Sequence, residues 1–362
     1  MTMKLPSVLI ERLSSYIALG ESRLETLALL ITGMIGARTV NLSHIASERG
    51  STAKHASTYR RLQRFFQYVE PGEDWAAYLI VALLGVTKPW ILCLDRTNWQ
   101  IGSKHVNILV LALVTRRHRV PLMWSMLDGP GNSGTAARIA LMERYLALFG
   151  AGSVKMLLAD REFIGGEWLR YLKKNNVPFT IRLKANMSVI TPQGQKISLS
   201  TLLRKTRGAH HFEAALPGDK EREPLTLGFA AKRLKGGELL IVAASKDASH
   251  ALTTYRKRWS IECLFGDAKT RGLNLEDTRI TNVRKLALLF AIVAIAIAWS
   301  SITAAKIIGR GTIKRKSHGY FAKSWFRTGF DALRNRIRHD PDHAIKPWVK
   351  LPRQNRQKAG VV

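Results

Sequence analysis

The sequence predicts an α/β protein in which helices flank a mixed β-sheet, and three observations lead to this prediction. Apolar runs of strand length alternate with longer segments of helical periodicity between residues 89 and 183. The segments on either side of this core are helical in pattern, and turn-rich sequence with short strand-like runs interrupts it. We therefore expect a helical N-terminal domain at 1–88, a core at 89–183 and 248–309, a β-rich insertion at 184–247, and a basic, helical C-terminal region at 310–362.

The composition indicates a polyanionic partner. The 362 residues include 57 Lys and Arg against 26 Asp and Glu, which gives a net charge of +31. Self-repulsion of this size is usually balanced by a polyanion, most often nucleic acid, and the alternative is a basic membrane-surface or ribosome-associated protein. The two cysteines lack the spacing of a zinc site or a disulfide scaffold and suit a reducing cytoplasm.

The N-terminal segment predicts two short helices around Gly50, and the second is rich in Ser, Thr, Tyr and Arg. A helix-turn-helix that reads DNA has this pattern, and so does an ordinary basic helical hairpin. In the DNA-reading interpretation the side chains toward the duplex are His55, Tyr59, Arg60, Arg61 and Arg64.

The core begins with three apolar runs, at 88–101, 105–117 and 119–129, whose tight connections predict an antiparallel meander. The next expected elements are a helix at 134–150, a strand ending at Asp160, a helix at 165–176 and a strand at 177–183. The order of strand, strand, strand, helix, strand, helix and strand is that of the ribonuclease-H-like fold.

Two aspartates end apolar strands of this core. Asp95 follows the first strand and Asp160 the fourth, and an Arg comes directly after each. A buried acid is costly to ionise unless something pairs with it, and a divalent cation would do so. Each aspartate alone is also compatible with an ordinary turn residue at a strand end.

Residues 255–272 predict a helix with an ordered polar face. Tyr255, Arg258, Glu262 and Lys269 fall within about 60° of arc at about 100° per residue, whereas Asp267 points about 140° away from Glu262. The adjoining flank for packing on a sheet is apolar and comprises Ile261, Leu264, Phe265 and Ala268. The alternative is a solvated face with Arg258 and Glu262 as an i,i+4 ion pair.

In the expected topology this helix crosses the neighbouring first and fourth strands and brings Glu262 to Asp95 and Asp160. Three carboxylates suit Mg²⁺, with Mn²⁺ as a substitute. Two such ions about 4 Å apart stabilise the attacking and leaving oxygens in a displacement at phosphorus, with water or a 3′-hydroxyl as nucleophile. The chain has no Ser-His-Asp or Cys-His pattern that would supply a protein nucleophile instead.

The spacing Tyr255-x2-Arg258-x3-Glu262-x6-Lys269 resembles the YREK signature of bacterial insertion-sequence DDE transposases of the IS-four-like family. The segments LDRTNW around Asp95 and LADREF around Asp160 look like the first two acids of the same catalytic core. The order of helical N-domain, split core with β insertion and basic C-terminus is also similar, so the resemblance covers most of the chain.

The resemblance implies an enzyme that cleaves DNA at the ends of its own mobile element and transfers the strands into target DNA. Arg258 and Lys269 would contact phosphates of the DNA end, and Tyr255 a terminal phosphate. The implied partners are double-stranded DNA, as terminal inverted repeats and target, and a second copy of the chain in the DNA complex. The implied location is the bacterial cytoplasm, with the nucleoid when DNA is bound.

One departure from the family concerns a Trp of the β insertion, which in some relatives holds a flipped base while a DNA hairpin forms. This chain has no Trp between Trp168 and Trp259. Phe212, His210 or His211 could stack a base instead. Two other functions stay open: a ribonuclease-H-like nuclease or resolvase without strand transfer, and a DNA-binding regulator without catalysis, against which the presence of all three acids argues.

Two C-terminal segments complete the prediction. Residues 286–299 are a charge-free apolar run, shorter than the roughly 20 residues that span a bilayer, and residues 300–305 bring it near that length. We expect a buried central helix here rather than a membrane span. Residues 310–358 contain fourteen Lys or Arg against three Asp, which predicts a solvated or DNA-tracking segment rather than a core.

Overall fold

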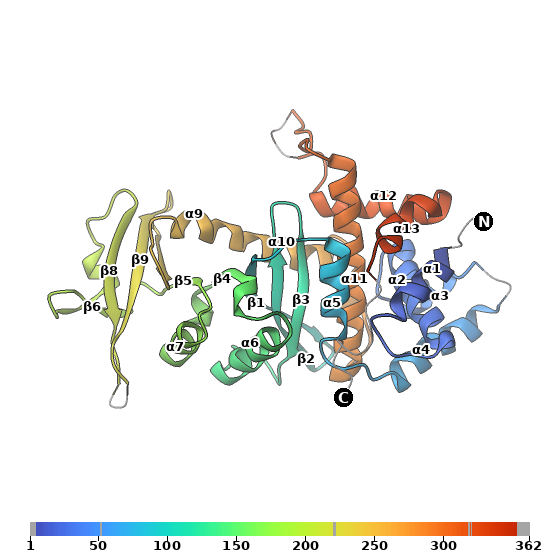
Figure 1. The fold of residues 1–362 in the computed structure, drawn as a ribbon, viewed down its shortest axis with the longest axis horizontal. Helices are drawn as coiled ribbons and strands as arrows, with labels where there is room; N and C mark the ends of the chain where they lie inside the picture. The colour runs from blue at the N-terminus through green and yellow to red at the C-terminus, as the bar shows by residue number, and fades with distance from the viewer. Residues whose placement is uncertain (1–4, 51–52, 220–221, 318, 320, 353–362) are drawn as a thin grey trace.

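The structure is a computed structural model and describes residues 5–50, 53–219, 222–317, 319 and 321–352. The molecule is elongated. The N-terminal helices lie at one end, the first strands of the sheet in the middle and the last strands at the other end (Figure 1).

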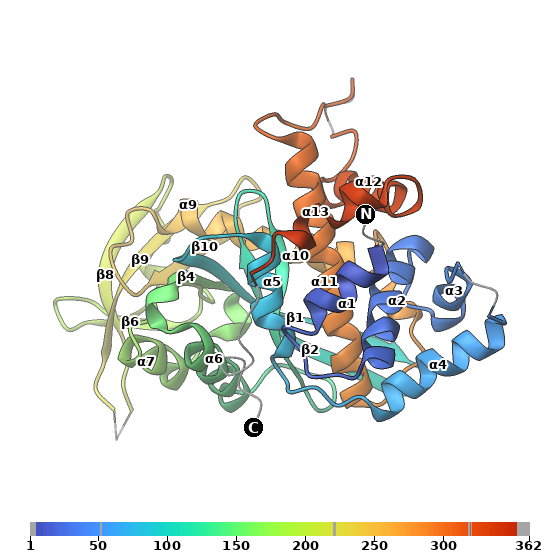
Figure 2. The ribbon, with the colours of Figure 1, turned by 45° about the vertical axis from the view of Figure 1, so that its right-hand side comes forward.

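Helices occupy the described part of the N-terminal segment, as the sequence predicts. They are Leu5–Leu13 (α1), Glu21–Ala37 (α2), Leu42–Ser47 (α3), His55–Tyr68 (α4) and Trp75–Leu84 (α5). Asn41 begins α3 by accepting a hydrogen bond from the backbone N–H of Ser43 at 3.0 Å, which satisfies one of the free donors of the first turn. Figure 2 shows these helices beside the long helix at the centre of the molecule.

The described strands form one mixed sheet of ten, in the order β3-β2-β1-β4-β5-β10-β9-β8-β6-β7. The first five strands are Trp90–Ile101 (β1), Lys104–Val114 (β2), Arg119–Met126 (β3), Val154–Ala159 (β4) and Phe179–Arg182 (β5). Strands β1, β2 and β3 form the predicted antiparallel meander, and β4 is parallel to both β1 and β5. The predicted neighbours, the first and fourth strands, are therefore paired.

The strands of the predicted insertion extend this same sheet. They are Ser188–Ile190 (β6), Lys196–Ser198 (β7), His210–Leu216 (β8), Leu225–Arg233 (β9) and Leu239–Ala244 (β10). Strand β10 pairs antiparallel with β5, through Val242 opposite Arg182, so the core continues into these strands without a break in hydrogen bonding.

Helices cover both faces of the sheet. Those after β3 are Thr135–Phe149 (α6), Gly166–Lys174 (α7), Leu199–Leu202 (α8), Ala251–Tyr255 (α9), Trp259–Ala268 (α10), Val283–Ile308 (α11), Trp325–His339 (α12) and Pro341–Val349 (α13). Helix α10 packs on β1, β2 and β3 from one side, and α6 and α7 lie against the other (Figures 1 and 2). Strand β2 is buried from Val106 to its end because both of its faces are covered.

Helix α11 is the predicted central helix and contacts α2, α5, α12 and β3. By length and composition it could cross a membrane, but 94% of its most apolar window is buried inside the fold. Trp299 in its middle is fully buried, and its indole N–H donates to the Ala344 carbonyl oxygen at 3.1 Å. The prediction of a buried helix is confirmed.

The prediction that residues 310–358 stay outside the core was wrong for helices α12 and α13. Phe330 and Trp348 are fully buried, and the Trp348 ring meets Trp299 edge to face at 5.3 Å between centroids. Charge counting failed because α12 is amphipathic: despite its many cations, it has a buried stripe of Phe326, Gly329, Phe330 and Leu333, and the helix packs on α11. Residues 353–362 lie outside the described residues.

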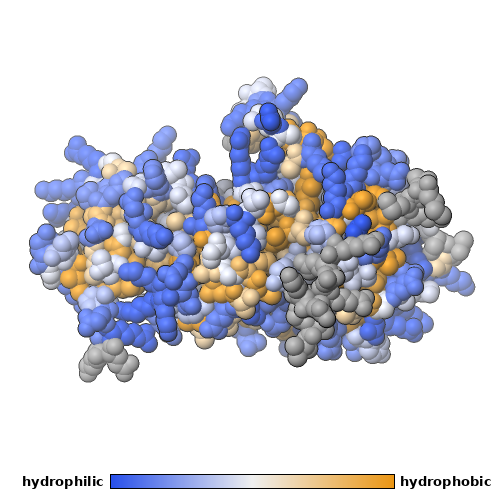
Figure 3. Space-filling view, in the orientation of Figure 1, coloured by the Kyte–Doolittle hydropathy of each residue, from blue (hydrophilic) through white to orange (hydrophobic). Residues whose placement is uncertain are grey.

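Hydrophilic side chains cover much of the face seen in Figure 3, with apolar atoms visible between them. This distribution is ordinary for a folded surface, since polar groups never cover it completely.

Candidate active site

Asp95 and Asp160 lie side by side where the pairing of β1 with β4 ends. The last parallel pair is Leu94 with Ala159, and each aspartate is the next residue of its chain. Neighbouring strands are about 4.8 Å apart, so the two side chains leave the sheet close together. The expectation that Asp95 ends its strand was wrong, because β1 runs on to Ile101 in a long hairpin with β2.

The helical segment 251–268 carries the third acid across these strand ends. It tightens to a 3₁₀ turn at Arg256–Arg258 between α9 and α10 and ends at Ala268. The predicted apolar flank holds it in place: Ile261 and Leu264 are fully buried and Ala268 nearly so, while Phe265 is partly buried.

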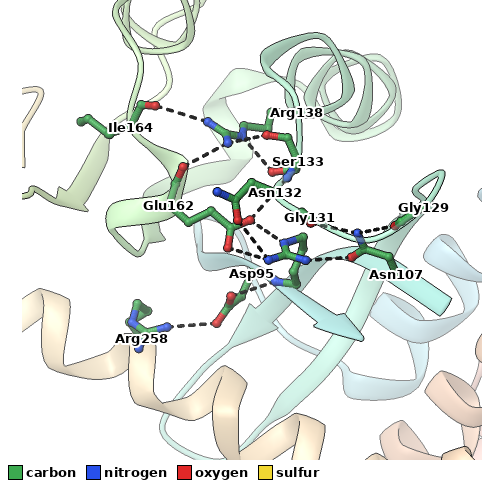
Figure 4. Close-up of polar contacts among 11 residues, drawn as sticks. Asp95, Asn107, Gly129, Gly131, Asn132, Ser133, Arg138, Glu162, Ile164 and Arg258 are labelled. Carbon is green, nitrogen blue, oxygen red and sulfur yellow. Dashed lines mark hydrogen bonds and ion pairs between the residues drawn. The ribbon is translucent and has the colours of Figure 1, made fainter. Parts of the chain in front are cut away.

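Arg258 joins two of the three acids. One guanidinium nitrogen donates to Asp95 Oδ2 at 3.0 Å and the other to Glu262 Oε1 at 2.5 Å (Figure 4 shows the contact with Asp95). The side chains of Arg258 and Asp95 are 10% and 17% exposed, so this ion pair is shielded from water, whereas Glu262 is 40% exposed. The predicted i,i+4 pair of Arg258 and Glu262 exists. Arg258 also binds Asp95, which lies on a strand distant in sequence.

The remaining acid, Asp160, is held by the hydroxyl group of a tyrosine. The Tyr255 hydroxyl donates to Asp160 Oδ1 at 3.0 Å, and Arg182 of β5 lies 4.0 Å from the same oxygen. Tyr255 and Arg258 therefore contact all three predicted acids: Tyr255 binds Asp160, and Arg258 binds Asp95 and Glu262. Asp267 is directed elsewhere, as predicted, and its nearest cation is Arg119 of β3 at 3.5 Å.

The electrostatics of the site follow from its burial. Burial raises the pKa of Asp95 to about 6, and the Arg96 backbone N–H and the Arg258 guanidinium oppose this rise. The negative charges of Asp160 and Glu262 raise the Asp95 pKa further, so the three acids sense one another. Burial also raises the pKa of Tyr255, which keeps its hydroxyl protonated as a donor.

Arg258 stays charged within this cluster. Burial alone lowers the pKa of its guanidinium, but the surrounding Tyr255, Asp160, Glu262 and Asp95 together raise it above its ordinary value. A permanently charged Arg between carboxylates is a strong but exchangeable partner for phosphate oxygens.

Lys269 lies outside the cluster. Because α10 ends at Ala268, the expected continuous stripe stops before this residue. Its ammonium donates to the Asn98 carbonyl oxygen at 2.9 Å and pairs with Glu276 at 2.9 Å. Lys269 therefore lies beside β1 at Asn98, which is three residues after Asp95.

The predicted DNA-facing residues of α4 divide into two groups. Arg60 and Arg64 are exposed and Tyr59 is half-buried. Arg61 turns inward instead, donating to Thr26 Oγ1 at 2.7 Å and pairing with Glu25 at 2.6 Å, both on α2. Arg64 and Tyr59 line a groove of about 870 Å³ between α4 and residues 277–282.

Sequence reasoning missed a polar network on the other side of Asp95. Arg96 and Glu162 form a two-pronged ion pair, with further contacts to Asn107, Asn132 and Ser133 (Figure 4). The signal was present in the sequence, because an Arg directly follows each aspartate and Glu162 lies two residues past Asp160.

The three carboxylates have the ligand chemistry of a hard cation such as Mg²⁺. Within the part of the chain that the structure describes, however, no group of three His, Cys, Asp or Glu side chains is close enough to hold a metal ion. Arg258 accounts for this spacing, since it stands between Asp95 and Glu262. The three carboxylates are therefore suitable ligands for a divalent cation, and in this structure Arg258 and Tyr255 donate hydrogen bonds to their oxygens.

Comparison with known proteins adds one finding. A family model described as a transposase DDE domain matches residues 87–299, which is 213 of 362 residues. The match runs from just before β1 to the middle of α11 and includes the three acids, Tyr255, Arg258 and Lys269. No curated protein matches the chain.

Proposed function

The chain belongs to the family of transposase DDE domains, and on that premise we propose that it cleaves DNA at the ends of an insertion sequence and transfers the strands into target DNA. One observation carries the proposal: Arg258 and Tyr255, on one helical segment, hold Asp95, Glu262 and Asp160 at the end of paired strands. The family match establishes the class of protein, and this geometry supports the assignment of the reaction to these residues.

We assign Asp95, Asp160 and Glu262 as ligands of two divalent cations, Mg²⁺ or Mn²⁺. Such ions, when bound, supply charge neutralisation at phosphorus and an activated oxygen nucleophile. A DNA phosphate competes with the carboxylates for Arg258, because guanidinium binds phosphate oxygens as readily as carboxylate oxygens. As a DNA end enters, Arg258 therefore turns to phosphate and releases Asp95 and Glu262 for cation binding.

The spacing of Tyr255, Arg258, Glu262 and Lys269 further supports membership of the IS-four-like family with its YREK signature. In that assignment Tyr255 binds a terminal phosphate once it is freed from Asp160. Lys269, beside β1, contacts the DNA backbone beyond the scissile bond. Arg60 and Arg64 of the N-terminal helical domain add contacts to double-stranded DNA at the terminal repeats.

The remaining features of the proposal follow from the family. The active form on paired DNA ends is a homodimer, and it acts in the bacterial cytoplasm on the nucleoid. The domain boundaries proposed from the sequence are kept, with residues 184–247 as an insertion that shares the core sheet.

The test uses a supercoiled plasmid that carries the gene with its flanking inverted repeats, incubated with Mg²⁺ and the full chain. Wild type should release the element and join its 3′ ends to target DNA. Glu262→Gln should lose at least about 10³-fold in cleavage, because it weakens a ligand of the cations that neutralise charge at the reacting phosphate. Glu167→Gln, at an exposed position at the start of α7, is the matched control and should behave as wild type.

Equal cleavage by wild type and Glu262→Gln would contradict the assignment of this acid. Cleavage by wild type without joined product would instead identify a nuclease or resolvase. Binding of the repeats without any cleavage would identify a regulator.

A further inference from the structure

Asp95 and Asp160 are not themselves a backbone pair of the β1–β4 ladder. The register of β1 with β4 ends at Leu94 opposite Ala159, so both aspartates lie one residue beyond the last backbone pair. Asp95 stays in the ladder of β1 with β2, opposite Val110, whereas Asp160 follows the end of β4. The distance between the two carboxyl groups therefore also depends on side-chain contacts, and Tyr255 and Arg258 supply those on one side of the sheet.

On the other side an ion pair joins β1 to the turn that follows β4. Arg96, directly after Asp95, donates through Nε to Glu162 Oε1 at 2.5 Å and through Nη2 to Oε2 at 3.0 Å. The side chains are 14% and 21% exposed, so water screens the pair weakly. A bidentate geometry of this kind fixes orientation as well as distance.

Neighbouring residues hold both partners of this pair. Arg96 also donates to Asn107 Oδ1 at 3.1 Å and to Asn132 Oδ1 at 3.3 Å. Asn107, almost fully buried on β2, in turn donates to the carbonyl oxygens of Gly129 and Gly131 (Figure 4). These contacts together hold the Arg96 guanidinium in one position.

The turn after Asp160 is anchored by a second arginine. Arg138 of α6 is 5% exposed and donates to the carbonyl oxygens of Glu162 at 3.0 Å and Ile164 at 3.4 Å. Its guanidinium also lies 5.1 Å from the centre of the Phe163 ring. The backbone that carries Glu162 is thus fixed independently of its side chain.

The network of Arg96 and Glu162 contacts Asp95 directly. The Arg96 backbone N–H donates to Asp95 Oδ1 at 2.8 Å. Because successive side chains of a strand point to opposite faces, Asp95 is directed to α10 while Arg96 is directed to the α6 side. Figure 4 shows Arg258 on one side of Asp95 and Glu162 on the other.

We propose that Arg96 and Glu162 are positioning residues that set the spacing of the Asp95 and Asp160 carboxylates and, through it, the affinity of the site for divalent cations. This inference rests on the proposed function. Neither side chain is assigned as a ligand or as a contact to DNA.

The experiment titrates the full chain with Mn²⁺ by isothermal titration calorimetry, without DNA. Glu162→Gln keeps the shape of the side chain and removes its charge, and Arg96→Lys keeps the charge and removes the bidentate geometry. Both variants should bind Mn²⁺ about 10- to 100-fold more weakly, which is the usual effect of losing a group that orients metal ligands. Glu162→Asp retains the charge and should keep part of the affinity.

The matched control is Asp74→Asn, which removes a similarly buried ion pair, with Arg144 at 3.2 Å, whose contacts do not include Arg96 or Glu162. Its Mn²⁺ affinity should stay within twofold of wild type, whatever happens to its melting temperature. Melting curves of all variants without metal separate loss of folding from loss of positioning.

A Glu162→Gln variant that folds and binds Mn²⁺ within twofold of wild type would overturn the positioning role while leaving the proposed function intact. A wild-type chain that binds no Mn²⁺ would overturn the proposed cation site and the positioning role together. An equal loss of affinity in Asp74→Asn would also overturn it, since the effect would then belong to stability.

Discussion

Asp95 is a buried carboxyl group whose neighbours include two further acids. Its side chain is 17% exposed, and burial raises its pKa to about 6 despite the nearby Arg258. An unfolded Asp has a pKa near 3.9. The folded protein therefore holds this proton more tightly than the unfolded chain does, and ionisation of Asp95 above pH 6 costs stability.

We predict that the free energy of unfolding depends on pH through this residue. Its favourable contribution is complete below about pH 4 and is lost as pH rises through about 6, a change of about 3 kcal/mol for two pKa units. Asp95→Asn should therefore be about as stable as wild type at pH 4 and more stable by up to about 3 kcal/mol at pH 8. Urea unfolding in EDTA at both values measures the difference.

Asp74 and Asp267, whose pKa values burial also raises to about 6, contribute equally to both proteins and cancel in this comparison. If the free energies of unfolding of wild type and Asp95→Asn change in parallel from pH 4 to pH 8, folding does not raise the pKa of Asp95.

Helix α4 shows how one element separates structural cations from available ones. Arg60 and Arg64 are four residues apart, share a face and are exposed. Arg61 lies about 100° around the helix and is held by Ser22, Thr26 and Glu25 of α2. Of these three arginines, Arg61 is paired within the protein, and Arg60 and Arg64 are exposed where the proposed phosphate contacts would form.

We predict a corresponding division in salt dependence. Arg64→Ala should reduce the slope of log affinity against log salt concentration by about 0.9, since one phosphate contact is lost. Arg61→Ala, one helical face away, should leave the slope unchanged and lower the melting temperature. Fluorescence anisotropy of a labelled duplex over a series of KCl concentrations measures both slopes. A reduced slope for Arg61→Ala alone would reverse the assignment.

At the scale of the whole molecule, α11 and α12 connect the sheet to the N-terminal helices. Arg338 of α12 pairs with Glu48 at 2.9 Å, and Arg334 donates to the Gly36 carbonyl oxygen at 2.8 Å. Helix α12 approaches α11 so closely that a Cβ at Gly329 would lie 2.0 Å from the Ser300 carbonyl oxygen. The backbone contact leaves no space for a larger residue.

We predict that Gly329→Ala lowers the free energy of unfolding by about 1–3 kcal/mol or more, because the two helices must move apart. Gly208→Ala is the control, since nothing lies within 4 Å of a Cβ built there. Urea unfolding of both variants gives the comparison. Equal stability of the two would mean that α11 and α12 tolerate separation.

Much of this arrangement was readable from local pattern. The strand order of the core, the burial of α11 and the apolar flank of α10 follow from periodicity, because a residue's face is set by its position along its own helix or strand. The helical arithmetic placed Glu262 on one side with Tyr255 and Arg258 and turned Asp267 away, and the expected strand topology brought Glu262 to Asp95.

Partners from distant segments were beyond such reasoning. That β10 continues the core sheet, that Asp95 lies inside a long strand, and that Arg61 turns inward each depend on which segment lies alongside. The sequence by itself determined which residues could meet at the candidate site. Only the tertiary structure decided that Arg96 meets Glu162 there, because this ion pair needs a strand and a turn that are 66 residues apart in sequence to be adjacent.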